Sequence, residues 1–322
     1  MSNHLNTIAI VGASGTVGTY ATRSLLAAGK TITAITRTGN TTSSFPPGVR
    51  VAPVSYDDPT SLVAALKGHD ALIITMSVTA PHDTETKLVD AAIEAGVKWI
   101  LPNEWGYQYG EQAGKDVFFG PAKKATREYI ESKGGQWVGI ACGFWYEFSL
   151  AGGVERYGFD LGKREVTLFD EGERSIGTST WEMCGVVVAR LLSLPVEKEG
   201  GGGPALVDWR NGHCHFASFT VSQRDMWESL MRVTGTEEGD WKVSKVPVGE
   251  FYQQGLKQMQ GGDRIGFAKC LYGRMFFEDN AGRQDLLYGL DNEKLDLPKE
   301  DLDAATKRAI GLHEEGYFQK KY

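Results

Sequence analysis

The 322-residue sequence predicts an α/β fold with a doubly wound parallel sheet, and three observations predict it. Apolar, β-branched runs alternate with helix-like segments through the first half of the chain. The first run, Ile8 to Val11, leads directly into three regularly spaced glycines, Gly12, Gly15 and Gly18. The second half is less regular and mixes short strands with helices, which predicts a smaller second α/β domain.

The alternation of strands and helices can be followed along the chain. Strand-like runs occupy residues 31–36, 51–54, 70–76, 98–102 and 136–143. Helix-like segments occupy residues 20–30, 57–68, 83–96 and 121–135, with proline near the start of two of them and glycine at the ends. This order is typical of parallel strands joined by helical crossovers.

The composition is that of a water-soluble globular chain and limits its partners. Hydrophobic residues make up 41% and charged residues 23%, and the formal net charge of −7 disfavours binding to nucleic acid or to an anionic membrane. No segment resembles a signal peptide or a membrane span, so we expect a cytoplasmic protein. No C-x-x-C pair occurs among the cysteines, so no disulfide framework is expected for Cys142, Cys184, Cys214 and Cys270.

The glycine-rich stretch NTIAIVGASGTVG predicts a dinucleotide-binding turn. Gly12 permits a sharp turn after the strand, Gly15 allows a diphosphate to approach the backbone, and Gly18 allows the helix to pack on the strand. The free N–H groups and the dipole of the helix then hold the phosphate charge. The predicted cofactor contacts in this stretch are Gly12, Ser14, Gly15, Thr16, Val17 and Gly18.

The end of the second strand predicts which dinucleotide binds. An acidic residue there would bind the ribose hydroxyls of NAD, but this chain has Thr36 and Arg37, with Thr38 and Asn40 nearby. A guanidinium can bind a 2′-phosphate through two parallel hydrogen bonds. We therefore expect NADP(H), with Arg37 and Thr38 as contacts; a solvated loop arginine is the alternative interpretation.

The chain resembles the NmrA-like and isoflavone-reductase-like branch of the atypical short-chain dehydrogenases. The resemblance is carried by the order and spacing of residues 11–18, 36–39, 57–73, 98–106, 118–134 and 215–235. The strand–helix alternation becomes less regular after residue 150, so we expect a Rossmann-type domain over residues 1–155 and a smaller substrate-binding domain over residues 156–322. The helix-like segment 181–194 is a candidate to return to the first domain.

The resemblance also implies a catalytic lysine. Lys123 aligns with the lysine that reductases of this family use as a general acid/base. Lys124, about 100° further around the helix, is the alternative if the alignment shifts by one residue. Tyr129 and Lys133 match Tyr-x-x-x-Lys but lie at the wrong end of the helix, so we discount them.

Further ligand contacts are expected beyond the carboxyl ends of the strands. Met76 and Asn103 are predicted to contact the cofactor, and Phe144 to pack against the nicotinamide or a flat substrate. The predicted substrate contacts are Trp105, Phe144, Trp145 and Tyr146. The chain departs from the family at Ser55, where many relatives have aspartate, and at Asn103 and Trp105, where they have serine and phenylalanine.

Two weaker signals have simpler interpretations. His213 and His215 alternate on a strand and so share a face, but without further ligands no metal site is expected. Ser179 and Thr180 precede an apolar helix and are expected to cap it.

The leading interpretation is an NADPH-dependent reductase of an aromatic or conjugated small molecule, with Lys123 supplying or relaying the proton. The alternative is an NmrA-like regulator that binds a dinucleotide and a partner protein without turnover. A catalytic lysine and an aromatic pocket favour the enzyme, because a sensor needs neither. A homodimer is compatible with the sequence.

Overall fold

A parallel sheet forms the centre of the N-terminal half of this computed structural model, which describes residues 3–39, 43–77, 80–81, 83–198 and 200–321. Its strands run in the order β12-β7-β5-β4-β1-β2-β3, and every neighbouring pair is parallel. The strands are β1 Thr7–Val11, β2 Thr31–Arg37, β3 Arg50–Val54, β4 Ala71–Ile74, β5 Trp99–Leu101, β7 Gln136–Ala141 and β12 Gly212–His215, with β6 Trp105–Gly106 beside β7.

Helices cover both faces of this sheet, because its strands carry buried side chains on both faces. Ile8 and Ile10 of β1 pack into one core with α1 (Thr16–Ala27) and α7 (Trp181–Leu191). The alternate residues Ala9 and Val11 pack into a second core on the opposite face. That core is covered by α2 Pro59–Leu66, α3 Thr84–Glu94 and α5 Gly120–Ser132. The expected doubly wound Rossmann-type fold is therefore confirmed.

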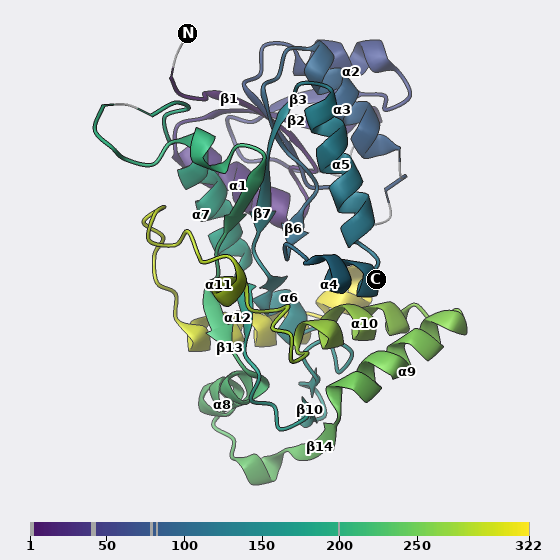
Figure 1. Cartoon of the computed structure of the whole chain (residues 1–322). Helices are drawn as coiled ribbons and strands as arrows, with labels where there is room; N and C mark the ends of the chain where they lie inside the picture. Colours follow the sequence, from purple (N-terminus) through teal and green to yellow (C-terminus); the bar gives the residue numbers. More distant parts are fainter. Residues whose placement is uncertain (1–2, 40–42, 78–79, 82, 199, 322) are drawn as a thin grey trace.

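A second group of elements lies below the sheet in Figure 1. It contains two small sheets, β14-β10-β9 and β13-β11-β8, and a third core. The strands are β8 Phe144–Trp145, β9 Phe159–Asp160, β10 Glu165–Phe169, β11 Ile176–Ser179, β13 Phe219–Val221 and β14 Lys242–Val246. The helices are α4 Glu111–Asp116, α6 Tyr146–Leu150, α8 Gln223–Thr234, α9 Val248–Gln260, α10 Ile265–Met275, α11 Gln284–Leu287, α12 Leu302–Glu314 and α13 Tyr317–Lys321.

Two segments from the second half of the chain complete the N-terminal layer. β12 extends the sheet at β7, and α7 packs closely on α1 because Gly185 lets the Tyr20 backbone approach. The division at residue 155 remains a prediction. No helix in the described part of the chain is long and apolar enough to cross a lipid bilayer.

The predicted cap of α7 is confirmed for one of its two candidates. The Thr180 hydroxyl accepts a hydrogen bond from the Met183 N–H at 3.0 Å. The Ser179 hydroxyl is buried and has no hydrogen-bond partner among the described residues. Thr180 therefore fixes the start of this helix.

The turn after β1 is built on glycines that permit unusually close backbone contact. Gly12 has a φ of +78°, and a Cβ there would lie 2.2 Å from the Thr75 carbonyl oxygen. A Cβ on Gly18 would lie 2.1 Å from the Gly12 carbonyl oxygen. The Thr75 hydroxyl donates to the carbonyls of Val11 and Gly12 at 2.9 and 3.1 Å. The first turn of α1 thus sits directly on the ends of β1 and β4.

This contact predicts a stability difference between two glycine variants. Gly18→Ala should lower the free energy of unfolding by roughly 1–3 kcal/mol or more, because the new methyl group clashes with rigid backbone. Gly311→Ala, within α12, meets no atom within 4 Å and should stabilise by about 0.5–1 kcal/mol. Urea unfolding of both variants measures the difference. Equal stability of Gly18→Ala and the wild type would contradict the close contact.

Candidate active site

The N-terminus of α1 presents an anion-binding surface at the carboxyl edge of the sheet. Gly15 is the N-cap and supplies no capping side chain, and the first turn contains no acidic residue. The Gly15 N–H donates to the Gly12 carbonyl at 2.8 Å, which closes the turn. The N–H groups of Thr16 and Val17 belong to the first turn, whose donors an α-helix leaves without intrahelical acceptors. These N–H donors, at the positive end of the helix dipole, therefore suit a diphosphate.

A cation and several hydroxyl groups lie near the ends of β1 and β2. Arg37 is the last residue of β2 and is exposed, and the Thr38 N–H donates to the Val54 carbonyl at 2.9 Å. The hydroxyl groups of Ser14 and Ser43 lie 2.9 Å apart. A guanidinium and hydroxyl groups are hydrogen-bond donors that can bind a phosphate monoester. No sequence pattern pointed to Ser43, because it lies in a loop. Asn40 is outside the described residues.

Asn103 joins the ends of β4 and β5, so two predicted contacts lie together. Its side-chain oxygen accepts from the Met76 N–H at 3.1 Å, and its amide nitrogen donates to the Met76 carbonyl at 3.3 Å. The Asn103 N–H donates to the Glu85 carboxylate at 2.7 Å. The amide thus behaves as a bridge between two loops at the same edge of the sheet.

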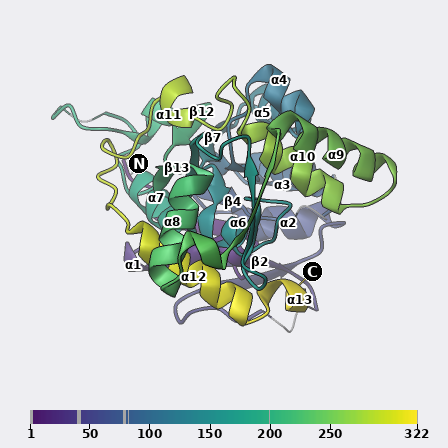
Figure 2. The same cartoon turned by 90° about the horizontal axis from the view of Figure 1, so that it is seen from below.

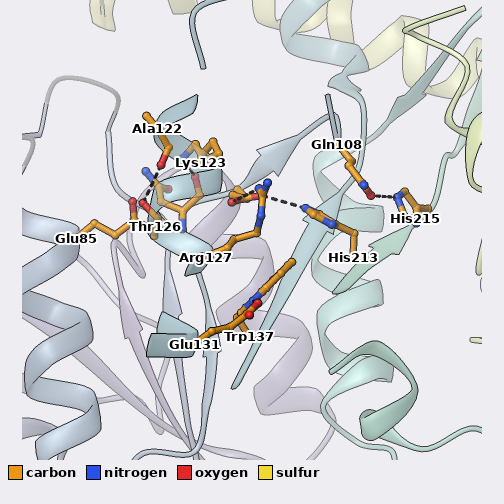
Figure 3. Close-up of polar contacts among 12 residues, drawn as sticks. Glu85, Gln108, Ala122, Lys123, Thr126, Arg127, Glu131, Trp137, His213 and His215 are labelled. Atoms are coloured by element: carbon orange, nitrogen blue, oxygen red, sulfur yellow. Dashed lines mark hydrogen bonds and ion pairs between the residues drawn. The ribbon is translucent and has the colours of Figure 1, made fainter. Parts of the chain in front are cut away.

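Lys123 and Lys124 face different surroundings. The ammonium group of Lys123 donates to the Asn103 carbonyl, and its side chain is half-buried (Figure 3). Lys124 is exposed and lies 3.7 Å from Glu128, one turn further along α5. The lysine that reaches the carboxyl edge of the sheet is therefore Lys123.

A buried ionic cluster fixes the segment that Lys123 contacts. Both nitrogen–oxygen distances from Arg127 Nη1 to the Glu104 carboxylate are short, 2.8 and 2.9 Å, and His213 Nε2 donates to the same carboxylate at 3.1 Å. Burial alone would raise the pKa of Glu104. The hydrogen bond from His213 and the positive charges of Arg127 and Lys123 have the larger effect, so the pKa of Glu104 lies below its usual value. Glu104 therefore stays ionised in the core.

Sequence reasoning missed this cluster, although one signal was present. Lys123 and Arg127 are four residues apart on α5 and share a face, and they contact consecutive residues, Asn103 and Glu104. The spacing shows only that the two cations lie together. Their partners lie in the segment that follows β5, and His213 of β12, which contacts Glu104, is still more distant in the sequence.

The two histidines of β12 share a face, as predicted, and each has a protein partner. Their ring centroids lie 5.9 Å apart. His215 Nε2 donates to the Gln108 side-chain oxygen at 2.6 Å, and its ring stacks on Tyr288 at 4.8 Å. Burial, followed by the charge of His213, lowers the pKa of His215 to about 4.

The predicted aromatic contacts divide into partly exposed and buried rings. Trp105 is partly exposed and donates to the Ile74 carbonyl at 2.8 Å, and Trp145 is partly exposed with an indole nitrogen that has no hydrogen-bond partner among the described residues. Phe144 is 7% exposed and stacks on Tyr272 at 4.0 Å. Tyr146 is fully buried, with its hydroxyl 2.8 Å from that of Thr306.

The discounted pair at the end of α5 lies away from this edge. The Tyr129 hydroxyl donates to Asp90 of α3 at 2.7 Å, and the Lys133 ammonium lies 3.4 Å from the same carboxylate. These contacts join two helices on the outer face of the sheet.

The fold and the glycine-rich turn are those of a Rossmann-type α/β protein, and known proteins share them. Residues 4–152 match the model of the NmrA-like family. Two curated relatives are similar over most of the chain. Oxidoreductase aprR of Aspergillus flavus is 27% identical over 80% of this chain and 83% of that protein. Oxidoreductase poxI of Penicillium oxalicum is 25% identical over 84% of this chain and 82% of that protein.

Solved structures with the same fold extend over nearly the whole chain. Isoflavone reductase superposes with a TM-score of 0.73 at 19% identity, covering 94% of this chain and 99% of that one. Leucoanthocyanidin reductase of Vitis vinifera, solved with NADPH, gives a TM-score of 0.71 at 14% identity and covers 95% and 100%. An NADPH-dependent quinone oxidoreductase of Escherichia coli gives 0.64 at 18% identity and covers 94% and 99%.

The lowered pKa of His215 predicts a pH-dependent loss of stability. The unfolded histidine binds a proton below about pH 6.5, whereas the folded one stays neutral down to about pH 4. Folding stability should therefore fall as the pH falls through this window. His215→Gln, which keeps a donor for Gln108, should reduce that fall by roughly 1–2 kcal/mol after solvent screening is allowed for.

Denaturant unfolding of the wild type and His215→Gln at pH 7.5 and pH 4.5 measures the effect. Parallel stability profiles for the two proteins would show that folding does not lower the pKa of His215, and would contradict the prediction.

Proposed function

We propose that this protein is an NADPH-dependent reductase of aromatic or conjugated small molecules, with Lys123 as the residue that supplies or relays the proton. The curated relatives are named oxidoreductases, which supports the redox class. Among the structural neighbours, one was solved with NADP⁺ and (+)-pinoresinol, and others with NADPH. These names support NADP(H) and suggest the substrate class.

The residues at the carboxyl edge fit an NADP(H) molecule. The first turn of α1, beginning at Thr16, offers N–H donors at the positive end of a helix dipole to the diphosphate. Arg37 offers a planar cation to the 2′-phosphate, and no carboxylate stands beside it in the sequence. We assign the loops held by Met76 and Asn103 to the nicotinamide end. When bound, the reduced nicotinamide supplies a hydride.

The contact between Lys123 and Asn103 carries the proposal for the proton. The ammonium group reaches the carboxyl edge of β5, where the fold binds ligands, while the neighbouring Lys124 points to solvent. An ammonium group held by a carbonyl keeps two further N–H donors that can be directed toward a substrate oxygen or a bound water. Arg127 and Glu104 hold the same loop, which limits the positions that Lys123 can take.

Trp105 and Trp145 are the partly exposed rings proposed to contact a flat substrate. Phe144 and Tyr146 are buried and are assigned a supporting role, since they contact Tyr272 and Thr306.

The first prediction from this proposal concerns cofactor choice. Arg37→Ala should weaken NADPH binding about 10- to 150-fold, because a charge-assisted contact contributes roughly 1.5–3 kcal/mol. NADH binding should change little, because NADH has no 2′-phosphate. Fluorescence titration of both cofactors measures this, and equal affinity of the wild type for NADH and NADPH would contradict the assignment.

The second prediction concerns the proton. Lys123→Ala should keep NADPH affinity but lower kcat by about 10²- to 10⁴-fold, the usual contribution of general acid–base catalysis. Lys124→Ala is the matched control and should be nearly silent. A panel of quinones, enones and phenolic ethers, screened by NADPH oxidation, supplies the substrate.

Two outcomes of that screen would count against the proposal. Oxidation that is unaffected in Lys123→Ala would remove the lysine from the mechanism. NADPH binding without oxidation of any compound would favour a dinucleotide-sensing regulator.

A further inference from the structure

His213 comes from the second half of the sequence, yet its ring packs against the edge of the N-terminal sheet. It belongs to β12, which lies beside β7 in the view of Figure 2 and pairs with it in parallel. The residue of β7 that pairs with His213 is Gly139, and a Cβ there would lie 2.4 Å from His213 Cδ2. Glycine at this position therefore leaves the space that the imidazole ring occupies.

An indole ring joins His213 to helix α5. The ring of Trp137 lies edge-on to that of His213, with their centroids 5.1 Å apart. The Arg127 guanidinium lies 5.4 Å from the centre of the same indole, whose N–H donates to the Glu131 carboxylate at 2.8 Å. Trp137 therefore contacts both β12 and α5, and it holds the imidazole on the side of the sheet where Arg127 lies.

His213 is the donor in its contact with Glu104. An ionised carboxylate can only accept hydrogen bonds, and the lowered pKa of Glu104 keeps that group ionised. Its Oε2 atom accepts from His213 Nε2 at 3.1 Å and from Arg127 Nη1 at 2.9 Å, and its Oε1 atom accepts from Arg127 Nη1 at 2.8 Å. The carboxylate is therefore held from two sides, by β12 and by α5.

The position of Glu104 bears directly on that of Lys123. The carbonyl that accepts from the Lys123 ammonium group is that of Asn103, and it belongs to the peptide that joins Asn103 to Glu104. Because a peptide group is planar, this carbonyl turns together with the Glu104 N–H. That N–H donates to the Pro102 carbonyl at 2.6 Å. A shift of Glu104 would therefore tilt the peptide and move the acceptor of Lys123.

We propose that His213 is a positioning residue for the proton donor. It holds the Glu104 carboxylate, and through the peptide between Asn103 and Glu104 it sets the place of the Lys123 ammonium group. The inference rests on the proposed role of Lys123 in proton transfer. It gives the second half of the chain, which contributes β12, a part in catalysis that acts through the first half.

A matched pair of amide variants tests the contact. His213→Gln places an N–H donor about where Nε2 lies, whereas the amide of His213→Asn is one methylene short of Glu104. The substrate is a compound that passes the NADPH-oxidation screen. His213→Asn should lower kcat by up to about 100-fold, the cost of misplacing a reacting group by about 1 Å. KM and the Kd for NADPH should keep their wild-type values, and His213→Gln should recover most of the lost kcat.

Two further variants complete the comparison, with thermal unfolding to check that each is folded. His215→Gln is the control, because His215 lies on the same face of β12 but bonds to Gln108, and it should leave kcat unchanged. Gly139→Ala displaces the imidazole by its new methyl group and should lower kcat as His213→Asn does. Wild-type kcat in both His213→Asn and Gly139→Ala would overturn the proposal. Equal losses in His213→Gln and His213→Asn would overturn it as well.

Chemical labelling follows Lys123 without any substrate. The reagent is an N-hydroxysuccinimide ester of acetic acid, and peptide mass spectrometry measures the rate at each lysine. Lys123 should react slowly in the wild type, where a carbonyl holds its half-buried ammonium group, and several-fold faster in His213→Asn. The exposed Lys124 is the internal control and should react equally in both proteins. Equal rates at Lys123 would contradict the positioning role.

A double variant separates this inference from the proposed function. If His213 acts only through Lys123, adding His213→Asn to Lys123→Ala should lower kcat no further. An additive loss would show that His213 acts by another route and would overturn the inference. If Lys123→Ala alone keeps the wild-type kcat, the proposed proton donor is wrong. If Lys123→Ala loses turnover while His213→Asn keeps it, only the role of His213 is wrong.

Discussion

The close approach of Gly12, Gly18 and Thr75 is the constraint on which the rest of the site depends. A Cβ on either glycine would overlap backbone oxygen, so the first turn of α1 can sit on β1 and β4 only with glycine at both positions. That placement directs the N–H groups of the turn toward the carboxyl edge of the sheet. It also brings Thr16 to the C-terminal helix and, through α7, ties the second half of the chain to the first.

The opposite end of the site depends on charge pairing inside the protein. Glu104 is 9% exposed, and a carboxylate at that depth costs several kcal/mol unless it is paired. Arg127 and His213 supply the pairing from α5 and β12, so the end of β5 cannot move without breaking buried ionic contacts. The Asn103 carbonyl that receives Lys123 belongs to this fixed segment. The same cluster therefore stabilises the fold and orients the proposed proton donor.

The sequence predicted what depends on local pattern. The glycine turn, the alternation of strands and helices, and the cap at Thr180 follow from spacing and residue type, and the resemblance to the NmrA-like family followed from the same segments. It could not predict Glu104 with Arg127 and His213, or Tyr317 with Thr16, because these partners are brought together only by long-range packing. The burial of single side chains was also not predicted: Tyr146 was expected to contact a ligand and is fully buried.

A crystal structure of the protein with NADP⁺ tests the central claim most directly. The account predicts the diphosphate at the Thr16 and Val17 N–H groups, the 2′-phosphate against Arg37, and the nicotinamide within reach of Lys123. A dinucleotide bound away from the glycine-rich turn, or bound there with its nicotinamide remote from Lys123, would contradict it.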